Sequence, residues 1–145
     1  MTLDTLVFGL AITGYAALGL SAMALALGRG SRLLSALTAL IVVSHVIGVW
    51  AHRFGWSLVE ATKNGWRGFF LFHFALVAIV AAALIHRHAS LFTHAGFVVV
   101  TGGAVGAVFK YDFVSHLRVP VLVVAGVTLA VVLFAYGRHW RGREG

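Results

Sequence analysis

The chain has 145 residues, of which 61% are hydrophobic and 10% are charged, whereas an average soluble domain is about half apolar and about a quarter charged. This composition predicts an integral membrane protein. The absence of cysteine excludes disulfides, thiolate metal sites, iron–sulfur clusters and covalently attached haem. The formal charge of +7 comes from basic residues scattered over every loop, so we expect no nucleic acid partner.

Five apolar segments approach or exceed the ~17 to 25 residues that a helix needs to cross about 30 Å of hydrocarbon. The first is longer than the h-region of a signal peptide and has no Lys or Arg ahead of it, so we expect a retained span. Four glycines lower the helix propensity of the fourth segment, and four spans would remain if it were re-entrant. The segments cover about 6–27, 33–51, 69–85, 89–109 and 119–137.

Short polar breaks separate most of these segments, so consecutive helices should be antiparallel neighbours in one all-α bundle, a single domain over residues 1–145. Only the stretch 53–68 is long enough to hold structure of its own. There Ser57 and Glu60 have the spacing of a capping box, which predicts a short interfacial helix over 57–63. Three tryptophans near it are expected in the headgroup region: Trp50, Trp56 and Trp66.

The charges of the loops predict an orientation. Arg138, Arg141 and Arg143 make the C-terminus basic, and basic segments favour the cytoplasmic side. An odd number of spans then places the N-terminus outside, with six Lys and Arg residues inside and five outside. We expect this topology in the inner membrane of a bacterium, with the lipid bilayer around the bundle.

Four histidines lie within or at the ends of the apolar segments: His45, His73, His94 and His116. An imidazole at membrane depth is costly without a partner and therefore marks a functional site by default. With a rise of ~1.5 Å per residue, His45 and His73 lie at similar depth on adjacent antiparallel helices, near the outer side. His94 lies near the inner side, with His86 in the turn before it. The histidines therefore divide into two layers.

Two layers of imidazoles on neighbouring helices are what a b-type cytochrome with two haems requires, and a single haem needs only one pair. We predict one haem b with His45 and His73 as its axial ligands. A second haem, held by His94 with His86, is the extension of this hypothesis. The remaining candidates for the cofactor site are His116 and two arginines at the surface where haem propionates would emerge, Arg53 and Arg67.

Spacing supports one haem better than two. His73 and His86 are thirteen residues apart, which gives about 20 Å of depth but directs the side chains about 140° apart around an ideal helix. Glycines that would let a macrocycle or another helix approach the backbone are Gly48, Gly102, Gly103 and Gly106.

In architecture alone, the predicted bundle resembles the cytochrome b membrane subunits that anchor respiratory dehydrogenases and reductases. The resemblance implies electron transfer between a quinol and a partner protein, with a quinone as a further cofactor. The chain would then be at most an electron-transfer subunit of an oxidoreductase, bound to other membrane or redox subunits or to a second copy of itself.

Two other functions are open. The chain could be a non-catalytic structural or assembly subunit of a respiratory or photosynthetic complex, whose histidines make interhelical hydrogen bonds or ligate a partner's pigment. It could also be a small proton or metal transporter, although it lacks the inverted repeat and the intramembrane acids that such proteins often have. All four acidic residues lie outside the predicted spans, which also argues against hydrolytic chemistry: Asp4, Glu60, Asp112 and Glu144.

Overall fold

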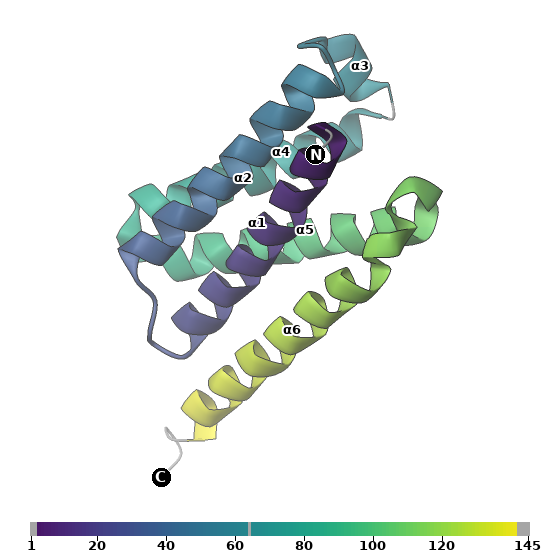
Figure 1. The fold of residues 1–145 in the computed structure, drawn as a ribbon. Helices are drawn as coiled ribbons and strands as arrows, with labels where there is room; N and C mark the ends of the chain where they lie inside the picture. Colours follow the sequence, from purple (N-terminus) through teal and green to yellow (C-terminus); the bar gives the residue numbers. More distant parts are fainter. Residues whose placement is uncertain (1–2, 64, 142–145) are drawn as a thin grey trace.

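The computed structural model describes residues 3–63 and 65–141, and every regular element in these ranges is helical (Figure 1). Five helices are long and apolar enough to cross a membrane, which confirms the predicted fold class. Their ends differ from the predicted ends by at most four residues. They are α1 (Leu3–Ala26), α2 (Arg32–His52), α4 (Trp66–Leu84), α5 (Ala89–Lys110) and α6 (Arg118–Arg141).

The glycine-rich α5 is one continuous helix of 22 residues, so the alternative of a re-entrant segment and four spans does not hold. A Cβ atom on Gly96 would lie 3.0 Å from Cγ1 of Ile79, and one on Gly103 would lie 2.5 Å from Cζ of Phe72. Both neighbours belong to α4. These two glycines therefore let α4 pack closely on α5, and the contact offsets their low helix propensity.

The helix α1 contacts three of the other long helices, α2, α5 and α6. Because α4 contacts α2 and α5, the helices α1, α2, α4 and α5 form a ring of four, and α6 packs against α1 and α5 from outside (Figure 1). The start of α1 and the end of α6 lie at opposite ends of the bundle (Figure 1). These ends are named here the N-terminal side and the C-terminal side.

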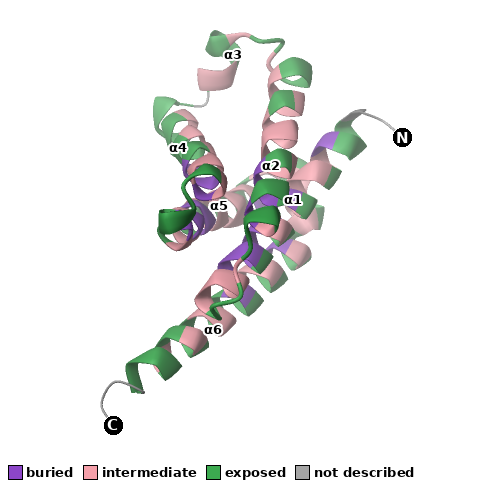
Figure 2. Cartoon of the chain, turned by 90° about the vertical axis from the view of Figure 1, so that its left-hand side faces the viewer, coloured by how far each residue is buried: buried purple, intermediate pink, exposed green. Residues whose placement is uncertain are grey.

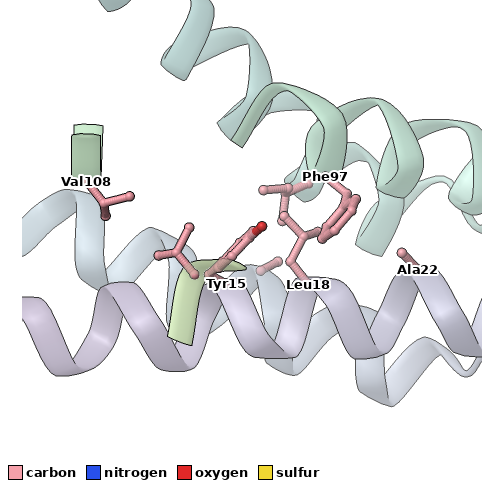
Figure 3. Close-up of a cluster of buried hydrophobic side chains, with 8 residues drawn as sticks. Tyr15, Leu18, Ala22, Phe97 and Val108 are labelled. Atoms are coloured by element: carbon pink, nitrogen blue, oxygen red, sulfur yellow. The ribbon is translucent and has the colours of Figure 1, made fainter. Parts of the chain in front are cut away.

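Most of the buried side chains lie in the half of the bundle towards the C-terminal side (Figure 2). Tyr15, Leu18 and Ala22 of α1 belong there to one buried cluster with Phe97 of α5 (Figure 3). The rings of Tyr15 and Phe97 stack with centroids 5.9 Å apart, and the Tyr15 hydroxyl lies 2.9 Å from Oγ1 of Thr101. Close packing and interhelical hydrogen bonds are what hold helices together in lipid, where apolar burial gives little driving force.

Small hydroxyl side chains join α1 to α2 in the same half. Thr38 donates to the carbonyl oxygen of Ala17 at 3.3 Å, so Ser21 is the donor in its 2.9 Å bond with Oγ1 of Thr38. The buried Thr93 of α5 lines the same seam, which leaves no space for a water molecule. The seam is dry and its Ser21–Thr38–Ala17 chain of hydrogen bonds is internally satisfied, so it stabilises one arrangement of the helices.

Aromatic rings pack the half of the bundle towards the N-terminal side. The short helix α3 (Leu58–Thr62) lies at this end, and its N-cap Ser57 accepts a hydrogen bond from the Glu60 amide at 3.4 Å, which confirms the predicted short helix and its cap. Trp50 of α2 is the centre of the ring contacts, with centroids 5.9 to 6.2 Å from those of Phe54, Trp56, Phe69 and His73.

Candidate functional site

His45 joins α2 to α1. Its Nδ1 lies 3.0 Å from the carbonyl oxygen of Val7, and the side chain is half-buried between the two helices. A carbonyl oxygen can only accept a hydrogen bond, so Nδ1 carries the proton. In the neutral ring the lone pair is then on Nε2, which is the form that binds a metal.

His73 has the same protonation pattern within a single helix. Its Nδ1 donates to the carbonyl oxygen of Phe69, four residues earlier, at 2.7 Å. The imidazole lies over the ring of Phe69, with centroids 4.0 Å apart, and the ring of Trp50 meets it edge-on at 6.0 Å. The lone pair of the neutral ring is again on Nε2.

The two histidines lie at one level of the bundle. His45 is seven residues before His52 at the end of α2, and His73 is seven residues after Trp66 at the start of α4. At ~1.5 Å per residue, both lie about 10 Å from the N-terminal side. The helices are antiparallel and in contact, as the sequence predicts.

Their rings nevertheless have different neighbours. Trp50 follows His45 by five residues, which corresponds to about 140° around a helix. His45 accordingly contacts α1, whereas Trp50, on another face of α2, contacts His73. The structure brings the two histidines to one depth, and their joint ligation of one iron stays a prediction.

His94 lies in the tightly packed half. Its Nδ1 is 2.6 Å from the carbonyl oxygen of Ser90, and its ring is 5.9 Å from that of Tyr136 on α6. Its Nε2 is buried and has no hydrogen-bond partner among the described residues. The predicted partner His86 is exposed in the turn η1 (His86–His88), and no ring contact between His86 and His94 is found in the described ranges. Their pairing around a second haem also stays a prediction.

The other candidates lie at the N-terminal side. His116 belongs to the turn η2 (Asp112–Leu117) and meets the ring of Phe8 edge-on, with centroids 6.2 Å apart. The guanidinium carbon of Arg53 is 5.0 Å from the ring centre of Phe113, and Arg67 is exposed in the first turn of α4. Both arginines thus lie at the end of the bundle that is closer to His45 and His73.

A groove of about 570 Å³ opens at the N-terminal side between the first turns of α1 and the end of η2. Sequence reasoning missed it. A weak signal exists, because Asp4, Phe8 and Ile12 recur every four residues and share one face of α1. We name this feature the N-terminal groove. The residues that line it are Asp4, Thr5, Phe8, Gly9, Ile12, Thr13, His116 and Leu117.

Within the described ranges, no cluster of three or more His, Asp or Glu side chains could hold a metal ion. Comparisons with family models, with curated proteins and with solved structures found no match for the chain. Any function must be argued from the site itself.

Proposed function

We propose that this chain is a small b-type cytochrome-like membrane subunit that carries electrons between a quinol and a partner protein. One observation carries the proposal. His45 and His73 lie at one depth on adjacent antiparallel helices, and in both rings the Nδ1 proton is held by a backbone carbonyl oxygen. Each neutral ring thereby keeps Nε2 for a metal.

Histidines that ligate a metal commonly donate their other ring N–H to a carbonyl oxygen, because this bond fixes the tautomer and raises the basicity of the ligand. His45 and His73 both have this bond. Haem, when bound, supplies one-electron chemistry that none of the side chains provides. Arg53 and Arg67 lie at the same end of the bundle, where guanidinium groups can pair with haem propionates.

His94 supports a second site of the same kind, nearer the C-terminal side. A buried nitrogen without a partner needs an explanation, since most buried polar atoms are hydrogen-bonded. Nε2 of His94 is such an atom. An axial bond to a second haem would satisfy it, so two haems on opposite halves of the bundle form the extended version of the proposal.

Visible absorption spectra of the purified chain, expressed with added haem precursor, test the proposal. The oxidised protein should show a Soret band, and dithionite should sharpen the bands of reduced haem b. His45→Ala and His73→Ala should each lose most of this absorbance. His52→Ala is the matched control, because it removes an imidazole at the end of the same helix α2 and should keep the spectrum.

Circular dichroism and gel filtration on the same samples show whether each variant is folded. A folded wild-type chain without a Soret band contradicts the proposal. Retention of the full spectrum by both His45→Ala and His73→Ala contradicts the ligand assignment.

A non-catalytic subunit of a larger membrane complex is the second candidate. It is favoured by Gly102 and Gly106, which are exposed on one face of α5 and have no atom within 4 Å of a Cβ built on either. Such a small-residue pair lets another membrane helix approach closely. Stoichiometric purification with a large complex, without colour in this chain, would support this candidate over the cytochrome.

A further inference from the structure

We infer that the N-terminal groove binds the ring of a lipid-soluble quinol. The substrate class rests on the proposed function, and the place of binding rests on the groove itself. The groove combines a polar end, a bare stretch of helix backbone and an apolar lower part, which are the three features that an amphiphilic flat ring with a long apolar tail requires.

The shape of the groove suits a flat ring. Gly9 has no atom within 4 Å of the position where a Cβ would lie, so a ring can lie directly on the backbone of α1. Phe8 and His116 both line the groove and meet edge to face, with centroids 6.2 Å apart and an interplanar angle of 86°. A third ring can pack edge-to-face on one of them and in parallel on the other.

The polar end of the groove offers the complementary hydrogen-bonding groups. The Asp4 carboxylate, 62% exposed, accepts hydrogen bonds and can bind a quinol hydroxyl. The imidazole of His116 can donate to, or accept from, the oxygen on the opposite edge of the ring. An anionic phosphate, by contrast, would meet the Asp4 carboxylate as a like charge, which favours a neutral ring over a phospholipid headgroup.

The lower part of the groove leads towards the apolar interior. Ile12 and Thr13 lie eight and nine residues beyond Asp4 on α1, so they are about 12 to 14 Å deeper at ~1.5 Å per residue. This is the direction in which the apolar tail of a quinol would run into the hydrocarbon. The ring would then lie near the headgroup level, where quinol protons can reach water.

The groove also lies next to the proposed haem ligand His45. Val7, whose carbonyl oxygen accepts the His45 hydrogen bond, directly precedes Phe8 in α1. The side chains of Val7 and Phe8, which are consecutive residues, point about 100° apart around the helix. The groove and His45 therefore contact adjoining faces of the same two turns of one helix, whose diameter is ~10 Å.

Binding of decylubiquinol to the full chain in lipid nanodiscs tests this inference. Wild type should bind one equivalent saturably, above the level of empty nanodiscs. Gly9→Leu fills the groove and should weaken binding at least tenfold. Gly126→Leu is the matched control on α6, at a glycine that likewise has open space around it, and it should bind like wild type.

A second pair of variants tests the carboxylate. Asp4→Ala should weaken binding of decylubiquinol roughly tenfold, because a hydrogen bond to a charged group is lost, and should weaken binding of decylubiquinone less, since the quinone has no hydroxyl to donate. The carboxylate of Asp4 also pairs with His52, whose Nε2 is 3.3 Å from Oδ1. His52→Ala breaks that pair without changing the wall of the groove and should leave binding unchanged.

Binding that is no higher than in empty nanodiscs, or that is equal in wild type and Gly9→Leu, overturns the inference. For the chain in detergent micelles, displacement of decylubiquinol by an equimolar amount of phospholipid assigns the groove to a lipid and overturns the inference as well. His45→Ala separates this inference from the proposed function, because it should lack haem absorbance and still bind decylubiquinol. A coloured wild-type chain that binds no quinol refutes the groove alone, and a colourless chain that binds quinol refutes the haem alone.

Discussion

The two halves of the bundle are packed in different ways. Towards the C-terminal side, small and hydroxyl side chains bring the helices together in a dry core, as Ser21 and Thr38 do between α1 and α2. Towards the N-terminal side, large rings fill the space between helices, and the groove between α1 and η2 stays open. One half therefore fixes the positions of the helices, and the other keeps an open groove.

The largest change in the free energy of unfolding is expected for a substitution where α1 meets α6. A Cβ atom on Gly19 would lie 2.6 Å from Oγ1 of the buried Thr128 and 3.2 Å from Val124. Gly19→Val should therefore lower the free energy of unfolding by about 2 to 3 kcal/mol, because overpacking forces stiff β-branched side chains aside. An SDS titration in mixed micelles measures this change.

Gly9→Val is the control on the same helix, in the open half, and should change stability by less than about 0.5 kcal/mol, as surface substitutions usually do. Equal losses for Gly19→Val and Gly9→Val would remove the distinction between the two halves.

A smaller effect is expected in the dry seam. Thr38→Val keeps the shape of the side chain and removes its bonds to Ser21 and to the carbonyl oxygen of Ala17. Interhelical hydrogen bonds in membranes contribute about 0.6 kcal/mol on average and up to about 1.7, so we expect a loss of about 1 kcal/mol in the same titration. Thr62→Val, at a threonine whose hydroxyl bonds only within α3, should have no effect. Wild-type stability of Thr38→Val would show that the seam does not hold the helices together.

The smallest change in the free energy of unfolding is expected for a substitution at the N-terminal side. Arg118 donates at 3.2 Å to the carbonyl oxygen of Val108, one of the last carbonyls of α5, which have no partner within the helix. Arg118→Met should lower the stability by about 0.5 kcal/mol, the lower end for one hydrogen bond. Lys110→Met serves as the comparison, since its amine lies 5.2 Å from the ring centre of Tyr111, a cation–π contact like that of Arg118 with Phe109 at 4.7 Å. The loss in Arg118→Met beyond that in Lys110→Met therefore reports the hydrogen bond. A loss larger than that of Thr38→Val would reverse the ranking of the halves.

Hydropathy and spacing were sufficient to predict the helices. Long apolar runs fix the spans, and the spacing of Ser57 and Glu60 predicts α3 because one hydroxyl caps its first turn. The shared depth of His45 and His73 also follows from the sequence, since it depends only on the rise per residue.

The direction in which each side chain points around its helix, towards lipid or towards protein, could not be predicted. Spans that are apolar all round do not reveal which face meets lipid and which meets protein. The contact of His45 with Val7 and the exposure of Gly102 and Gly106 depend on helix rotation, which apolar composition leaves open. The groove was missed for the same reason, because its far wall comes from η2, more than a hundred residues beyond Asp4.

Electron paramagnetic resonance of the oxidised, haem-loaded chain tests the central claim most directly. Two imidazole ligands on one ferric iron give a low-spin signal, and we expect this signal in wild type and its loss in both His45→Ala and His73→Ala. A wild-type chain with no haem signal, or with a low-spin signal that survives in both His45→Ala and His73→Ala, would contradict ligation by histidines of α2 and α4.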